Sequence, residues 1–111
     1  MAGKFEIFKD KAGEFRFRLK AGNGETILAS EGYKDKSSAV NGIESVKKNV
    51  DLLARFEKKL SSSGKPYFVL KAANHHVIGN SEMYSSEDAR DNGIKSVMHA
   101  APLASIDDQT A

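Results

Sequence analysis

Hydrophobic and polar side chains alternate along two stretches near the start of the chain, residues 4–9 and 14–21. In the second stretch apolar residues alternate with cations: the apolar set is Phe15, Phe17, Leu19 and Ala21, and the cationic set is Arg16, Arg18 and Lys20. A period of two is typical of a strand with one buried face. Turn residues at 10–13 and 22–24 separate these stretches from a third expected strand at 26–33.

The third strand has its own expected phase. We expect Ile27, Ala29 and Tyr33 to face inward, which requires a hairpin loop of odd length before them. The same phase places Glu31 on the helix side of the sheet and Leu28 on the outer face.

The apolar spacing then changes to that of a helix. Residues 36–48 are predicted to be helical from the apolar positions Ala39, Ile43, Val46 and Val50, with Asp35 or Ser37 as the cap. A second set of strands is expected at 55–60, 66–72 and 77–84, followed by a helix at 87–99. Ser86, followed by Glu87 and Asp88, is a strong start signal for that helix.

The two sets are copies of one unit. A shift of 51 residues superimposes Asn41-Gly42-Ile43-x-Ser45-Val46 on Asn92-Gly93-Ile94-x-Ser96-Val97, without a gap. The sequence therefore predicts an α+β fold: two tandem βββα(β) repeats, 4–54 and 55–105, forming one mainly antiparallel sheet with both helices on one face and an approximate two-fold axis. Residues 1–111 are expected to be a single domain with a flexible tail at 106–111.

Three repeated motifs give the chain a resemblance to the YegP-like proteins, a family of small uncharacterised bacterial proteins. These are the doubled Asn-Gly-Ile-x-Ser-Val helix, the Phe-Glu pair that opens each unit, and a Ser-Glu-x-Tyr strand end. The resemblance spans residues 4–104 and implies a tandem βββαβ fold with exchanged C-terminal strands. It implies no activity and no site residues. Short extended pieces after each helix, near Leu52 and Leu103, are the candidate exchanged strands.

Composition narrows the class of protein. The chain is 40% hydrophobic, carries a net charge of +2 and has no cysteine. The lack of cysteine excludes disulfides and thiolate chemistry, and the near-neutral charge disfavours a typical nucleic-acid binder. We expect a cytoplasmic monomer without a membrane segment. His75, His76 and His99 lack the spacing of a metal site, so we expect no metal, cofactor or catalytic residue.

Several repeated positions are candidates for structure or function. Gly42 and Gly93 lie inside helices, where glycine costs about 1 kcal/mol relative to alanine, so we expect close packing there. The polar pairs Asn41/Ser45 and Asn92/Ser96 indicate a hydrogen-bonded helix face or a ligand surface. Glu31 and Glu82 are either anions near a helix N-terminus or perturbed acids. Tyr33 and Tyr84 are expected to pack at the strand ends, with the hydroxyls reaching water.

Three classes of function remain open. The favoured one is a non-enzymatic interaction or structural module that uses the exposed sheet face, with Phe8, Leu28, Tyr67 and Val69, or the sheet edges. The second is single-stranded nucleic-acid binding through a basic and aromatic face formed by Arg16, Arg18, Lys20, Tyr67 and Lys71. The third is a small-molecule binder or enzyme whose site repeats as Glu31/Tyr33/Asn41 and Glu82/Tyr84/Asn92.

Overall fold

A computed structural model describes residues 3–110, which form seven β-strands, two α-helices and two short 3₁₀ helices. In chain order these are β1 (Lys4–Lys9), β2 (Phe15–Lys20), β3 (Thr26–Ala29), α1 (Lys36–Asn49), η1 (Leu53–Arg55), β4 (Phe56–Leu60), β5 (Pro66–Lys71), β6 (Val77–Asn80), α2 (Glu87–Ala100), η2 (Ala101–Leu103) and β7 (Ser105–Asp108). Both predicted helices are present, and each extends one residue further than expected. Ser86 caps α2 by accepting a hydrogen bond from the Ala89 N–H at 3.1 Å.

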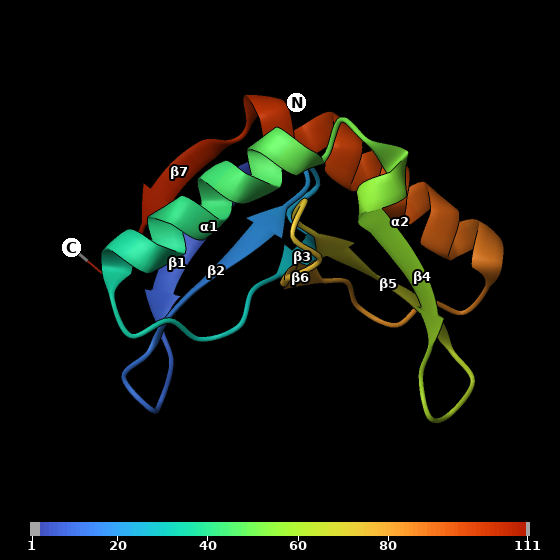
Figure 1. Ribbon diagram of the computed structural model, residues 1–111, viewed down its shortest axis with the longest axis horizontal. Coiled ribbons are helices and arrows are strands. Elements are labelled where there is room, and N and C mark those ends of the chain that lie inside the picture. The colour runs from blue at the N-terminus through green and yellow to red at the C-terminus, as the bar shows by residue number, and fades with distance from the viewer. Residues whose placement is uncertain (1–2, 111) are drawn as a thin grey trace.

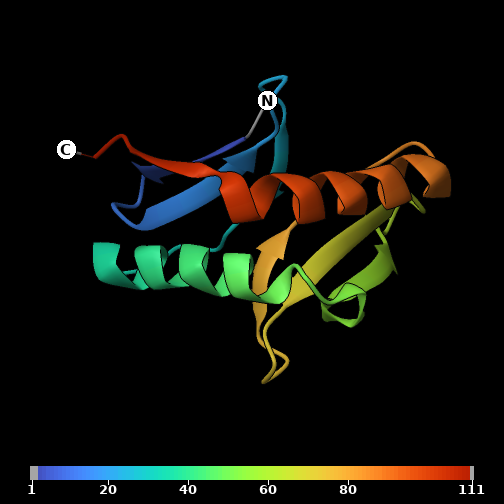
Figure 2. The ribbon, with the colours of Figure 1, turned by 90° about the horizontal axis from the view of Figure 1, so that it is seen from above.

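All seven strands belong to one sheet, in the order β4-β5-β6-β3-β2-β1-β7. Every pairing is antiparallel except that of β7 with β1, which is parallel. Both helices cover the same face and run side by side, and β3 and β6 meet at the centre (Figures 1 and 2). The predicted fold class is therefore confirmed.

The two halves repeat the same aromatic packing. Phe17 contacts Phe5 edge-on at 5.9 Å between ring centroids and stacks on Tyr33 at 6.4 Å. In the second half Phe68 contacts Phe56 at 5.7 Å and Tyr84 at 6.2 Å with the same orientations. Each tyrosine ring lies over the glycine of its helix, so that a Cβ on Gly42 would be 2.8 Å from both the Phe17 ring and the Tyr33 hydroxyl oxygen. Crowding therefore requires glycine at this point of the helix.

The expected phase of the third strand was wrong at Leu28 and Ala29, whereas Ile27 and Tyr33 pack in the core as expected. The register shifts between Leu19 and Lys20, so that Leu19 lies opposite Leu28 while Lys20 lies opposite Thr26. This bulge turns Leu28 inward, where it is fully buried, while Glu31 is exposed. The second unit has the same shift after Leu70, and Glu82 is exposed as well. One extra residue reverses the facing of the side chains next to it. The bridge between Phe15 and Tyr33 restores Tyr33 to the helix side.

At the centre of the sheet, the two copies differ in a complementary way. Leu28 has Gly79 as its counterpart in the second unit, and the two residues are in contact across the junction of β3 and β6. A Cβ on Gly79 would be 2.7 Å from Leu28 Cγ and Cδ2. Two leucines therefore cannot occupy this position together. The junction therefore accommodates one leucine side chain, and the equivalent position of the other unit is glycine.

The C-terminal segment also differs from the expectation of a flexible tail. Residues 105–108 form β7, which pairs with β1 of the first unit, and the Gln109 N–H donates to the Ile7 carbonyl at 2.8 Å. On the helix side, Asp108 forms an ion pair with Lys36 of α1. The exchanged strand that the resemblance implied therefore exists after α2. It does not exist after α1, because η1 leads directly into β4.

Candidate functional site

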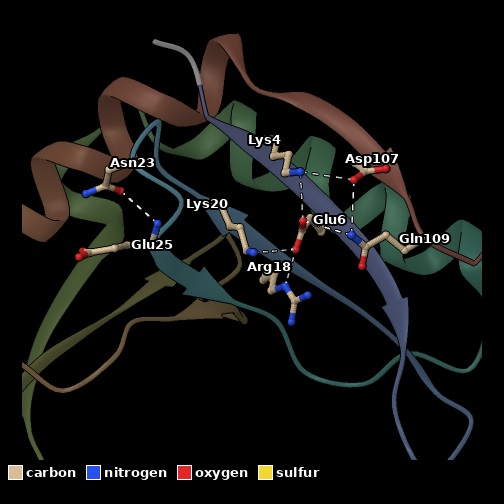
Figure 3. A network of polar contacts seen from close by, with 8 residues as sticks. All are labelled: Lys4, Glu6, Arg18, Lys20, Asn23, Glu25, Asp107 and Gln109. Atoms are coloured by element: carbon tan, nitrogen blue, oxygen red, sulfur yellow. Dashed lines mark hydrogen bonds and ion pairs between the residues drawn. The ribbon is translucent and has the colours of Figure 1, made fainter.

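The outer sheet face of the first unit is organised around one carboxylate, Glu6. Its side chain is only 4% exposed, and it accepts a hydrogen bond from Arg18 Nε at 2.6 Å. Lys4 and Lys20 lie 3.3 and 3.4 Å from the same carboxylate, and Gln109 donates to it at 3.1 Å (Figure 3). The Arg18 hydrogen bond and the Lys4 contact outweigh desolvation and lower the pKa of Glu6 to about 2.

Other cations on this face are also paired. Arg16 Nε lies 2.6 Å from Asp10, and Lys71 of the second unit forms an ion pair with Glu57, the counterpart of Glu6. The basic residues singled out from the sequence are therefore engaged by carboxylates of the same sheet face. Such pairing stabilises the fold and leaves less positive charge for a phosphate backbone.

The apolar patch expected on the outer face is smaller than the sequence indicated. Leu28 points inward because of the bulge, and Val69 lies on the outer face but is only 3% exposed between Glu57 and Asn80. Phe8 is half-buried beneath the Arg18 guanidinium, whose carbon is 4.5 Å from the ring centroid. Tyr67 is half-buried as well. The open face therefore offers less apolar surface for a partner than expected.

The Glu6 cluster predicts a specific dependence of stability on pH. The folded pKa of about 2 lies below the ordinary value of 4.5, so the ionised carboxylate stabilises the fold above pH 4.5, and this stabilisation is lost as the pH falls toward 2. Glu6→Gln should therefore lower the free energy of unfolding by about 1–3 kcal/mol at pH 7. Urea unfolding at pH 7, 5, 4 and 3 should show this difference narrowing as the pH falls.

Glu57→Gln is the matched control for that prediction, because Glu57 holds the same position with a side chain that is 43% exposed rather than 4%. A Glu57→Gln variant that loses as much stability as Glu6→Gln, with the same pH profile, would contradict the burial argument.

The residues of the expected paired sites do not line one pocket. Glu31 and Glu82 are exposed. The rings of Tyr33 and Tyr84 pack beneath the helix glycines, and their burial, together with the negative charges of Glu31 and Glu82, raises the pKa of both hydroxyls. The geometry therefore provides no shared site for the glutamate, tyrosine and asparagine of either unit.

The polar pairs on the helices are also unconnected. The Asn49 amide donates to the Ser45 carbonyl at 2.8 Å and to its hydroxyl at 3.3 Å, whereas Asn41 is exposed. Asn92 and Ser96 are both exposed. Asn41 and Ser45 line an open hollow of about 540 Å³ on α1, together with Glu44, Lys47 and Lys48. Neither Glu31 nor Tyr33 takes part in it.

The sequence indicated the sheet edges as a possible binding surface without assigning strands to them. In the structure, β4 forms an open edge. No strand among residues 3–110 pairs with its outer side. Between β4 and α2 lies a groove of about 330 Å³, lined by Leu53, Lys58, Asp91, Ile94, Lys95 and Met98. Lys58 and Asp91 form an ion pair at 3.2 Å within it. We call this surface the β4 groove.

The approximate two-fold axis relates the β4 groove to the outer side of β1, where β7 is bound. Strand β4 is the counterpart of β1, and β1 carries β7 along its outer side. Figure 1 shows β7 and β4 at opposite ends of the sheet. The two edges differ because of the segment that follows each helix. Residues 101–110 contain η2 and β7, whereas residues 50–55 contain only η1 and lead into β4.

A family model for a domain of unknown function, DUF1508, matches residues 10–57 and 61–108. The chain belongs to the DUF1508 family. The two matches begin 51 residues apart, at the period of the internal repeat. Each match begins just after the first strand of its unit and extends past the helix into the strand that follows it.

Relatives cover nearly the whole chain. A UPF0339 protein of Stutzerimonas stutzeri, described as lying in the ptx operon 5' region, is 61% identical, with 96% of each chain covered. The UPF0339 protein YegP of Escherichia coli K12 is 52% identical, with 99% of this chain and all of the relative covered. The resemblance to YegP-like proteins is therefore confirmed, and these relatives are uncharacterised.

Two solution NMR structures match the fold of this DUF1508 protein. A UPF0339 protein of Shewanella oneidensis has a TM-score of 0.91 and 56% identity, with 97% of this chain and 92% of that chain covered. YegP of E. coli, described as a protein of unknown function, has a TM-score of 0.93 and 51% identity, with 98% and 94% covered. These likenesses place the fold without assigning an activity.

The described part of the chain lacks two further features. Within residues 3–110, no three histidine, aspartate or glutamate side chains gather closely enough to hold a metal ion. Neither helix there has the length and apolar character needed to cross a membrane.

Proposed function

We propose that this DUF1508 protein is a non-enzymatic interaction module, monomeric and cytoplasmic, that binds an extended segment of a partner protein along the open edge of β4. The observation that carries the proposal is the pseudo-symmetric relation between the two sheet edges. On one edge β7 lies against β1 and α1, and on the other the equivalent place beside β4 and α2 is a groove. Adding a strand to an exposed edge is a recurring mode of peptide recognition.

The edge of β4 has the chemistry that strand addition requires. The Ile7 backbone carbonyl accepts from the segment after β7, so Lys58, the counterpart of Ile7, presents its backbone groups to the open side. Main-chain hydrogen bonds along this edge would provide affinity, and the apolar floor of the groove at Ile94 and Met98 would select a side chain.

The titratable groups support a binding role rather than a catalytic one. The pKa values of Glu6 and Asp108 are both lowered to about 2, and both carboxylates are held in ion pairs that connect strands or join a strand to a helix. Their perturbation is accounted for by the fold.

A random peptide library displayed on phage tests the proposal. We expect wild-type protein to enrich peptides, and Lys58→Pro to abolish the enrichment, because proline removes the outward N–H of an edge strand while such strands tolerate it. Leu53→Ser should weaken enrichment through the groove, and Leu103→Ser, at another exposed leucine outside the groove, should not.

Thermal melts of all variants establish that the fold is retained. Equal enrichment by wild type and Lys58→Pro would contradict the proposal, and so would no enrichment at all. A single-stranded oligonucleotide that binds at Arg16, Arg18 and Lys20 at physiological salt would favour the nucleic-acid alternative instead.

A further inference from the structure

We infer that the partner segment runs parallel to β4 and presents an apolar, an acidic and a basic residue at three successive positions. This inference rests on the proposed function, and it goes beyond it by stating the direction and chemistry of the segment. The filled edge of the same molecule supplies the register from which both follow.

The direction follows from the pairing of β7 with β1. Phe5 lies beside Ile106, Glu6 beside Asp107 and Ile7 beside Asp108, in parallel. The 51-residue repeat maps these three residues of β1 onto Phe56, Glu57 and Lys58 of β4. A segment that docks in the equivalent way has its N-terminal end near Arg55 and its C-terminal end near Leu60.

The position beside Phe56 calls for an apolar side chain. It lies on the helix side of the sheet, over the groove lined by Leu53, Ile94 and Met98. On the filled edge, Lys47 of α1 donates to the Ala104 carbonyl at 3.0 Å. Its counterpart on α2 is Met98, whose thioether cannot donate a hydrogen bond to a backbone carbonyl. This end of the β4 groove therefore suits an apolar side chain of the bound segment.

The position beside Glu57 calls for an acidic side chain on the outer face. On the filled edge this place is taken by Asp107, whose carboxylate lies 3.5 Å from Lys4 Nζ. The counterpart of Lys4 is Arg55, but it lies in η1 and its Nε donates to Asn49 Oδ1 of α1 at 3.1 Å. The cations on the outer face beside Glu57 are Lys59, at 4.0 Å, and Lys71. Glu57 does not repel the incoming acid strongly, because Lys71 holds its carboxylate in an ion pair.

The position beside Lys58 calls for a basic side chain. On the filled edge Asp108 occupies it and pairs with Lys36 at the start of α1. The counterpart of Lys36 is Glu87, which is exposed at the start of α2 and lies 3.9 Å from Arg90. Asp91, one turn further along, is already paired with Lys58 and Arg90, so Glu87 is the acid with which an incoming cation would pair. The sign of the charge is therefore reversed between the two edges, which disfavours the C-terminal strand of a second copy.

The test uses three synthetic peptides derived from residues 101–110 of this chain, with binding followed by amide chemical shifts. We expect the peptide with Asp108→Lys to bind with shifts along β4 and α2, and the unsubstituted peptide to bind about three- to fivefold more weakly, the size expected for one exposed ion pair. Adding Ile106→Ser to the Asp108→Lys peptide should lower affinity at least tenfold, because the apolar anchor is lost.

Each alternative result has a definite meaning. Equal affinity for all three peptides, or shifts confined to β1 and β7, would overturn the inferred chemistry, as would a dimer that buries β4 in sedimentation equilibrium. If none of the three binds while displayed random peptides still enrich through Lys58, the inference fails and the proposed function stands. If random peptides fail to enrich too, both fail.

Discussion

Replacing Gly42 with leucine is expected to lower the free energy of unfolding by about 2–3 kcal/mol, although leucine is the better helix former by about 1 kcal/mol. The Cβ of the new side chain would collide with the Phe17 ring and the Tyr33 hydroxyl, since each would lie only 2.8 Å from it. Phe17 is fully buried and cannot move aside. The melting temperature should fall by roughly 8–15 °C.

The second copy provides an internal comparison for this prediction. All three atoms nearest to a Cβ on Gly93 belong to Tyr84, the closest at 2.3 Å. Tyr84→Ala should therefore relieve much of the cost of Gly93→Leu. Tyr33→Ala should relieve less of the cost of Gly42→Leu, because Phe17 still blocks the site. A Gly42→Leu protein that melts within two degrees of wild type would contradict the crowding argument.

The second large effect is expected at the centre of the sheet. Gly79→Leu places two leucines where one fits, and Leu28→Gly removes a fully buried side chain. Each single change should cost about 3–5 kcal/mol, through overpacking in the first case and a cavity in the second.

The exchanged variant Leu28→Gly/Gly79→Leu is the decisive member of this set. Because the pseudo-two-fold axis relates the two positions, the leucine in the exchanged variant enters the space left by the other, and we expect at least about 2 kcal/mol of the summed loss to be recovered. Urea denaturation of the four proteins gives the coupling energy directly. Additive losses would show that the two residues do not share one space, and that the junction is not built as described.

The architecture was predictable because both signals that define it are local. Alternation at 14–21 and helical spacing from Ala39 to Val50 each depend on neighbouring residues, and the 51-residue repeat combined the units into one sheet. The facing of Leu28 was not predictable in the same way. It depends on a register shift after Leu19, and a one-residue shift leaves no mark in the apolar pattern.

The candidate sites were predicted less well than the fold, for a related reason. Arg16 and Arg18 were correctly placed on the outer face, but their carboxylate partners, Asp10 and Glu6, come from elsewhere in the hairpin and are set by register. The β4 groove depends on which edge β7 covers. Both edges have the same unit sequence pattern, and only the length of chain after each helix distinguishes them.

The place and direction of a bound segment along β4 can be measured directly. The measurement is paramagnetic broadening of amide signals by the Asp108→Lys peptide of residues 101–110, with a nitroxide attached at its N-terminus. Parallel docking predicts strong broadening near Leu53 and Arg55 and weak broadening near Leu60. Broadening strongest at Leu60, or centred on β7 or on Arg16 and Arg18, would contradict it.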